Sequence, residues 1–276
     1  METKSDSRLG TEKILKLMLQ LALPSVLAQI VNVLYNIIDR IYIGRIPGVG
    51  AAALTGVGVT FPVITIVSAF AGFANGGGAP LAAIAMGQRD NKRAEKILGN
   101  STFLLLVFSG GLMAVFLGLK KPLLYMFGAS DYTIEYAASY ITVYLLGTVF
   151  VELAVGLNTF ISCQGYARTA MISVLIGAIV NIILDPVFIF VLDMGVVGAA
   201  TATVISQALS AVWVLRFLIS AKSQIHLRIS DLKPDVKILG SILALGVSPF
   251  IMAATESAIT IVMNHGLQTY GGDLYV

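Results

Sequence analysis

The sequence predicts an all-helical integral membrane protein, and three observations lead to this fold class. Of the 276 residues, 57% are hydrophobic and only 12% are charged, with a mean hydropathy of +0.88, whereas about a quarter of the residues of a soluble domain are charged. Apolar stretches as long as the roughly 20 residues that a helix needs to cross a bilayer recur along the chain. None of them alternates between apolar and polar residues, as the strands of a membrane barrel do.

Seven apolar stretches, separated by polar connections, are the predicted membrane helices. The first follows a polar tail, residues 1–13, and is too long for a secretory signal peptide, so we expect it to stay in the protein as an anchor. A polar linker, 221–238, separates a six-helix region, 14–220, from a further region, 239–276, that contains the seventh helix. The predicted spans are 14–44, 52–76, 97–118, 135–158, 170–192, 196–219 and 239–265.

The positions of the 18 basic residues predict the orientation in the membrane. Most of them lie in the tail, in the second and fourth connections and around the linker. The opposite side has only Arg40, Arg45, Lys120 and Lys121. Because lysine and arginine accumulate on the cytoplasmic side, we expect a multi-pass protein of the plasma (inner) membrane whose N-terminus and linker are cytoplasmic. The net charge of +3 then reflects topology, and no nucleic-acid partner is expected.

Polar side chains recur at helical spacing inside four of the apolar spans. Because residues three and four positions apart share one face of a helix, each set forms a stripe. Lipid would penalise such a stripe, so we expect all four to face one another or water inside the protein. The stripes are Asn32, Tyr35, Asn36 and Asp39; Tyr140, Tyr144, Thr148 and Glu152; Asn181 and Asp185; and Thr203, Ser206, Gln207 and Ser210.

Asp39 and Asp185 are the members of these stripes that packing explains least. An ionised carboxylate at membrane depth costs at least ~2.5 kcal/mol, so it usually serves ion or proton handling. Pro186 has no N–H, and the carbonyl of Ile182 therefore loses its helical partner. A free carbonyl beside the Asp185 carboxylate and the Asn181 amide would form an all-oxygen cluster suited to a hard cation or a proton.

Depth in the membrane separates the polar residues into two levels. With the N-terminus inside, an outer level contains Asp39, Tyr140, Asp185 and Thr203. Asn158, on the face of Tyr140, lies about 27 Å deeper by helical rise and belongs to a lower level of any shared cavity. Glu152 and Glu256 are intermediate cases whose role the sequence does not decide. We expect only a role in joining helices for Thr148, Ser206 and Ser210.

The glycine-rich segments and the histidines do not indicate a nucleotide or metal site. NGGGAP (75–80) is not followed by Gly-Lys-Ser/Thr, and GVGVTF (56–61) lacks the third glycine of a dinucleotide fingerprint. We expect both segments to allow close helix packing or bending. His226 and His265 have no partner at ligand spacing, so we expect no metal site apart from a coupling cation, and no cofactor.

The seventh span resembles the first when Pro249 is placed on Pro24. Asp39 then aligns with Asn264, and both blocks run into glycines. Six helices separate the two starts, an even number, so the two copies would cross the membrane in the same direction. Duplicated halves of this kind are typical of secondary transporters.

Six segments together resemble the multidrug and toxic compound extrusion (MATE) family over nearly the whole chain. No single motif is specific, but the combination is, and the last segment is most similar to the branch that contains the DNA-damage-inducible relatives. The segments are LALPSVLAQIVNVLYNIIDRIYIG followed by GAAALTGVG (21–44 and 50–58), MGQRDNKRA (86–94), CQGYARTAM (163–171), NIILDP (181–186), GVVGAATATVISQ (195–207) and MNHGLQTYGGD (263–273).

The resemblance implies twelve helices in two six-helix lobes around a V-shaped cavity, of which this chain would contain the N-terminal lobe and the first helix of the second lobe. It also implies export of cationic or amphipathic drugs or metabolites, driven by inward Na+ or H+, with the C-terminal lobe required for transport. The implied coupling site comprises Asp39, Tyr140, Asn181, Asp185 and Thr203, where Na+ would contact all but the tyrosine. The predicted substrate cavity comprises Asn32, Tyr35, Asn36, Asn158, Gln207 and Glu256.

Two other functions are weighed against an antiporter. A flippase for lipid-linked saccharides, from the same wider superfamily, would need cationic groups in its cavity, yet only Lys16, Arg40 and Arg216 lie within the predicted spans, each close to the end of its span. An intramembrane enzyme would need paired Asp-rich motifs, or a Ser–His or zinc constellation, and the sequence has none. We therefore expect a transporter that is not an enzyme. The sequence does not distinguish Na+ from H+, because an aspartate pair serves both.

The predicted orientation can be checked by cysteine labelling of intact cells. In a background without Cys163, the sole cysteine, Ser223 or Asp131 is replaced by cysteine and exposed to an impermeant thiol reagent. Position 131 should be labelled and position 223 should not. The reverse pattern would overturn the orientation.

Overall fold

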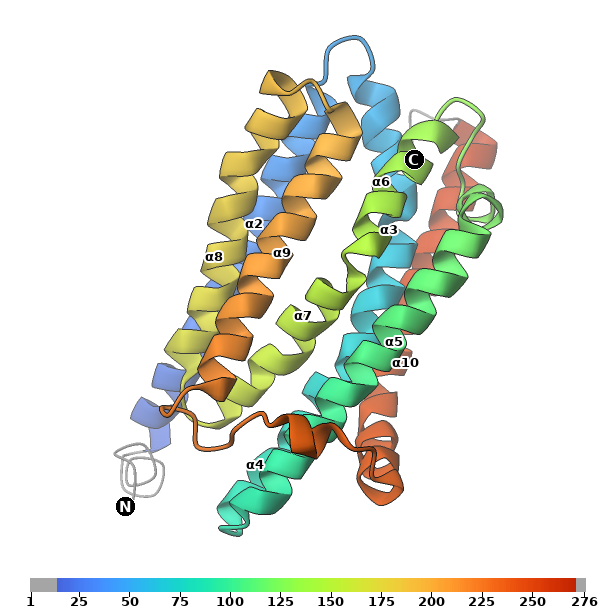
Figure 1. The fold of residues 1–276 in the computed structure, drawn as a ribbon. Coiled ribbons are helices and arrows are strands. Elements are labelled where there is room, and N and C mark those ends of the chain that lie inside the picture. The colour runs from blue at the N-terminus through green and yellow to red at the C-terminus, as the bar shows by residue number, and fades with distance from the viewer. Residues whose placement is uncertain (1–13, 272–276) are drawn as a thin grey trace.

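The computed structural model describes residues 14–271. The regular structure of this part of the chain is helical, and the helices pack into one bundle (Figure 1). The predicted tail, 1–13, and the segment from 272 onward lie outside the described residues. The elements are α2 (Ile14–Gly44), α3 (Gly50–Gly72), η1 (Phe73–Gly78), α4 (Ala79–Gly87), α5 (Asn91–Met126), α6 (Ile134–Leu146), α7 (Thr148–Cys163), α8 (Ala167–Pro186), η2 (Val187–Val191), α9 (Gly195–Ile219), η3 (Ile229–Leu232) and α10 (Val236–Gly271).

The number of helices that could cross a membrane agrees with the prediction. Six described helices are long and apolar enough, and α6 with α7, bent by 59° at Gly147, make a seventh. The second predicted span is part of a longer one, Gly50–Gly87, which combines α3, the π-helix η1 and α4. The all-helical membrane fold predicted from composition is therefore confirmed.

Several helices begin earlier than the apolar pattern predicts, and two of them, α5 and α10, do so where a polar side chain caps the helix outside the apolar run. The Asp90 carboxylate accepts the Arg93 N–H at 3.0 Å, so α5 begins at Asn91 instead of 97. The Asp235 carboxylate accepts the Lys237 N–H at 2.9 Å, so α10 begins at Val236 instead of 239. The connection between α9 and α10 is accordingly 220–235, shorter than the predicted linker 221–238.

The predicted role of the NGGGAP glycines in close helix packing is confirmed. Gly76, Gly77 and Gly78 lie in or at the end of the π-helix η1, where α10 crosses it. A Cβ on Gly77 would come within 2.1 Å of the Ile242 carbonyl oxygen, and one on Gly246 would come within 2.6 Å of the Phe73 Cα. Only glycine on both sides permits this approach of two backbones.

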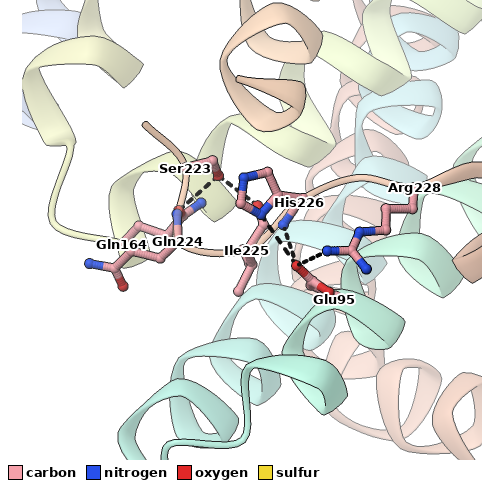
Figure 2. A network of polar contacts seen from close by, with 7 residues as sticks. All are labelled: Glu95, Gln164, Ser223, Gln224, Ile225, His226 and Arg228. Atoms are coloured by element: carbon pink, nitrogen blue, oxygen red, sulfur yellow. Dashed lines mark hydrogen bonds and ion pairs between the residues drawn. The ribbon is translucent and has the colours of Figure 1, made fainter. Parts of the chain in front are cut away.

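The connection 220–235, called the linker, is held to the bundle by buried polar side chains (Figure 2). The Glu95 carboxylate of α5 accepts the His226 backbone N–H at 3.1 Å and lies 3.6 Å from the Arg228 guanidinium. The Gln164 side-chain oxygen accepts the Gln224 N–H at 2.7 Å and the Ser223 hydroxyl at 2.9 Å. Neither anchor was predicted from the sequence, because both partners are far away in the chain.

Asn100 is the third anchor of the linker. Its carbonyl oxygen accepts the Asp235 N–H at 2.7 Å, and its amide group donates toward the Asp231 and Lys233 carbonyls at 3.5 and 3.4 Å. A Cβ on Gly99 would meet the Asp231 carbonyl at 2.2 Å, so the glycine lets the linker lie directly on α5. The linker is therefore a strap across the ends of the helices.

The burial of Ser223 changes the labelling experiment described above. Ser223 is 3% exposed, so a cysteine there would resist any reagent from either side. Its neighbour Lys222 is exposed and is not one of the residues whose hydrogen bonds hold the strap to the bundle. Position 222 is the informative site for the linker side, with Asp131 for the other.

The strap can be tested with Asn100→Ala. Loss of the Asn100 side chain leaves the Asp235 N–H and two carbonyls without their partner, which typically costs about 1–3 kcal/mol in a buried setting. Tryptic cleavage of the purified protein after Arg228 and Lys233 should accelerate several-fold, as followed by mass spectrometry. Ser241→Ala is the control, because Ser241 bonds only to the Lys237 carbonyl of its own exposed helix turn. Equal cleavage in both variants would mean that Asn100 does not hold the strap.

Candidate functional site

A polar cavity of about 360 Å³ lies between α2, α7, α8 and α9. These helices pack in a continuous ring, α2 on α8, α8 on α9 and α9 on α7, and Figure 1 shows α2, α8 and α9 side by side. Its volume lies within the range of small-molecule sites, about 300–1,000 Å³. The Asn75 amide from η1 also reaches it, so the irregular glycine segment contributes to the cavity.

Three of the four predicted polar stripes, those on α2, α8 and α9, contribute residues to the lining of this cavity. On α2 the stripe is buried or half-buried, whereas Val33, Leu34 and Ile37 on the opposite face are about half exposed. Four of the six predicted cavity residues line it: Asn32, Tyr35, Asn158 and Gln207. Further polar lining residues are Ser25, Gln29, Asn75, Thr159, Ser162, Ser173, Asn181, Thr203, Ser206 and Ser210. No charged side chain belongs to the lining within the described residues.

Two predicted cavity residues do not line it. The Asn36 amide group instead donates to the Asn32 carbonyl of its own helix at 2.7 Å. Glu256 is exposed on α10, which packs on α3 and η1, away from the ring of cavity helices. Its neighbour Ser257 faces inward and donates to the Pro62 carbonyl at 3.0 Å. A single carboxylate in an apolar helix does not reveal which face the next helix covers.

The Asp39 and Asp185 side chains meet one turn beyond the cavity. Tyr35 on α2 and Asn181 on α8 line the cavity, and each aspartate lies four residues further along its helix. The two carboxyl groups interact directly with each other. They are 8% and 0% exposed, respectively. The sequence-based inference that Asp185 would face Asp39 across helices therefore agrees with the structure.

Asn181 connects this pair to α9. Its amide group donates to the Asp185 carboxylate at 3.2 Å and toward the Thr203 hydroxyl at 3.4 Å. The Thr203 side chain is in turn hydrogen-bonded to Tyr140 of α6, which is 4% exposed. All five predicted coupling residues thus form one cluster, to which α2, α6, α8 and α9 contribute.

Several acceptor oxygens in this cluster have no protein donor. Asp39 Oδ1, Asp185 Oδ2 and Asn181 Oδ1 are buried without a hydrogen-bond partner in the described residues. Leaving such an atom unsatisfied costs about 1–3 kcal/mol, more for a charged group. Arg40 interacts electrostatically with Asp39, but it is exposed and its guanidinium lies 4.3 Å above the Phe61 ring. A proton or an oxygen-coordinated cation would satisfy these atoms, so the donor set fits either ion.

Pro186 ends α8 directly after this cluster. The chain continues as the π-helix η2, where the Leu192 N–H donates to the Val187 carbonyl at 2.9 Å. Proline lacks the N–H that would continue the α-helical ladder, which explains the change in helix type. The predicted disruption next to Asp185 is therefore present as a change from α to π geometry.

Some polar residues act as the interhelical contacts that the sequence predicted. The Ser210 hydroxyl of α9 donates to the Ser173 carbonyl of α8 at 2.8 Å, and the Ser173 hydroxyl donates to the Asn158 side chain of α7 at 3.0 Å. Ser206 instead bonds within its own helix, to the Ala202 carbonyl. Thr148 has no hydrogen-bond partner for its hydroxyl, so the expected role in joining helices does not describe it.

Comparison with known proteins finds close counterparts of this arrangement. The MatE family model matches residues 24–187. The multidrug export protein MepA of Staphylococcus haemolyticus (strain JCSC1435) is 26% identical over 258 residues, which cover 94% of this chain and 57% of that protein. The chain thus spans little more than half the length of this relative.

Two solved structures are similar over most of the chain. One, described as the outward-facing conformation of a multidrug resistance MATE family transporter of the MOP superfamily, has a TM-score of 0.87 and 27% identity, covering 99% of this chain and 60% of that one. The other, the inward-facing conformation of such a transporter, has a TM-score of 0.82 and 29% identity, covering 87% and 54%. These descriptions agree with the expectation of a transporter that is not an enzyme.

Proposed function

Because the chain belongs to the MatE family, we propose that it provides the ion-coupling lobe of an exporter that exchanges cationic or amphipathic small molecules for inward H+ or Na+. The observation that carries this proposal is the contact of Asp39 with Asp185, two buried carboxyl groups at the end of a polar cavity. The cavity binds the substrate, and the pair binds the coupling ion.

The pair couples export to the ion gradient because two buried carboxylates in contact are unfavourable unless a proton or cation is bound to them. Two carboxylates in contact repel by about 4 kcal/mol at 4 Å and an effective dielectric constant of 20. A proton or cation on the pair removes this repulsion and satisfies the unpartnered oxygens of Asp39, Asp185 and Asn181. When the ion leaves, negative charge develops at the end of the cavity. A cationic substrate is then bound more tightly, and by linkage the substrate weakens binding of the ion.

The remaining cluster residues position the pair. Asn181 donates its amide hydrogens to Asp185 and Thr203, which leaves its own oxygen free to accept from or coordinate the ion. Tyr140 fixes Thr203 from the opposite side. With Na+ as the coupling ion, the oxygens of Asp39, Asp185, Asn181 and Thr203 would be its ligands.

The chemistry of the cavity supports a cationic or amphipathic substrate over a saccharide pyrophosphate. Its lining is polar and uncharged, and the charged groups at its end are acidic. A pyrophosphate would need lysine, arginine or histidine in the lining, and no described lining residue is of these types. The flippase therefore stays the weaker alternative. Transport would also need the C-terminal lobe, since the curated relative is longer than this chain.

The coupling ion can be assigned by transport in vesicles that contain the complete protein. A pH gradient and a Na+ gradient are imposed separately, and export of a fluorescent organic cation is followed. We expect one of the two gradients to drive export and the other to have little effect. Export that continues unchanged without either gradient would contradict the antiport proposal.

The site assignment is tested by Asp39→Asn and Asp185→Asn in the complete protein. Asparagine keeps the shape of the side chain but removes the charge that responds to the gradient, so both variants should insert normally and lose gradient-driven export. The double variant should be little worse than either single one, as expected of residues that act as one unit.

The matched control is Asp193→Asn. Asp193 is an exposed carboxylate eight residues from Asp185, and its φ of 52° is a conformation that asparagine tolerates. The Asp193→Asn variant of the complete protein should export like the wild type. Near-normal export by Asp185→Asn at equal expression would show that this carboxylate is structural.

A further inference from the structure

Glu152 of α7 is a further buried carboxyl group, outside the Asp39–Asp185 pair and far from Glu95 at the linker. Its side chain is 0% exposed, and neither Oε1 nor Oε2 has a hydrogen-bond partner. The hydroxyl of Thr148, one turn earlier, is also buried without a partner. A buried carboxylate without an ion-pair partner is strongly destabilising, and Glu152 has no such partner within the described residues. Burial at this position therefore favours the neutral acid over the carboxylate.

Glu152 lies between the Asn158 level of the cavity and the aspartate pair. Val155 and Thr159 line the cavity on α7, and Glu152 precedes them by three and seven residues, on the same face of the helix. In Figure 1, α7 runs in the direction opposite to α2 and α8. Asn158 of α7 is hydrogen-bonded to Ser173 of α8, so these two residues share a level. From there Glu152 lies six residues, about 9 Å, along α7, and Asp185 lies twelve residues, about 18 Å, along α8. Glu152 is therefore on the same side of Asn158 as the pair, but nearer the middle of the cavity.

The surroundings of Glu152 contain one other ionisable group in electrostatic contact with it. The helices α3 and α4 and the π-helix η1, which pack on α7, contain no titratable residue. Those of α5 and α9 lie toward the helix ends and do not reach Glu152. On α8, Asp185 is engaged with Asp39 and Asn181. From α6, the Tyr144 hydroxyl interacts electrostatically with the Glu152 carboxyl.

Tyr144 also connects Glu152 with the pair. Its ring is stacked on that of Tyr140, with centroids 6.5 Å apart and an interplanar angle of 13°. Tyr140 interacts electrostatically with Asp39, and Tyr144 with Tyr35, which itself interacts with both aspartates. The two stacked tyrosines, which are also hydrogen-bonded to Ser68 and Thr203, are thus in electrostatic contact with Glu152 on one side and with the pair on the other.

We propose that Glu152 is a second proton-binding site, which exchanges its proton with the Asp39–Asp185 pair by way of the Tyr144 and Tyr140 hydroxyls. The proposal rests on the export function proposed above. In the exchange, the proton leaves Glu152 and a proton arrives at the pair, so one carboxylic acid becomes a carboxylate while the other carboxylate becomes the acid. The tyrosines are neutral before and after, and no oxidant or further reactant is needed.

Proton binding at Glu152 is tested first without transport. Infrared spectra of the complete, purified protein are recorded across a pH titration, and the C=O band of protonated carboxylic acids is compared between variants. Glu152→Gln should lose one component of this band, which the Asp39→Asn, Asp185→Asn double variant keeps. Glu135→Gln, which changes an exposed carboxyl of α6, is the control and should leave the band unchanged at neutral and alkaline pH, where exposed carboxyl groups do not contribute to it. An identical band in Glu152→Gln and wild type would overturn the proposal.

The exchange itself is tested by counting protons per exported molecule in vesicles. If each site carries one proton, Glu152→Gln should lower this number by roughly half, because one of two linked sites is lost. If the pair carries Na+ instead, Glu152→Gln should move no protons per exported molecule but as many Na+ ions as the wild type. An unchanged proton count would overturn the role in exchange. Wild-type protein that does not export at all would refute the proposed function instead, while the infrared result would still decide whether Glu152 binds a proton.

Tyr144→Phe keeps the ring stacked on Tyr140 but removes the hydroxyl. It should retain the Glu152 band and slow its appearance after a pH jump, whereas an unchanged rate would refute the path through Tyr144. Should Glu152→Gln fail to fold, Glu152→Asp serves in its place. The shorter acid should shift the band component assigned to residue 152, and an unshifted component would overturn the assignment.

Discussion

The contact between the Asp39 and Asp185 carboxyl groups is the constraint on which the cavity depends. Two acidic groups can meet in a membrane protein only if both helices turn their polar stripes toward each other and their apolar faces outward. On α2 this leaves Val33, Leu34 and Ile37 exposed, and it sets the rotation of α2 against α8. The same rotation brings Asn32 and Tyr35 into the cavity. The contact between the two carboxyl groups therefore determines both the site and the packing of the helices that form its walls.

The other side of the bundle is held by a different kind of contact. Here α10 crosses η1 at glycine backbones, and the strap 220–235 lies on α5 by way of Gly99, Glu95 and Asn100. These contacts are close and specific, whereas the cavity helices meet through polar side chains with room between them. Rigid packing on one side lets the cavity stay open on the other, because the walls need not collapse to bury apolar surface.

The sequence predicted the spans, the inward stripes and the meeting of Asp39, Asn181 and Asp185, because the rule against polar groups in lipid applies to every residue of a stripe. It could not predict which helix covers which face. Glu256 is the clearest case, since a lone carboxylate carries no stripe and the structure leaves it exposed. Helix ends were also missed, where Asp90 and Asp235 extend helices beyond the apolar run. Asn75 gave no periodic signal, because it lies in a π-helix.

The oxygens around each carboxyl group limit which ion it can hold. A hard cation in a protein takes about six oxygen ligands. Around the pair, Asp39, Asp185 and Asn181 each present an unpartnered oxygen, and the Thr203 hydroxyl lies beside them, so water could complete a cation shell. Around Glu152, the Thr148 hydroxyl is the other buried unpartnered oxygen on the same helix face. This site has a single carboxyl group, so it offers a cation less negative charge than the pair does. We therefore expect the pair to hold H+ or Na+ and Glu152 to hold H+.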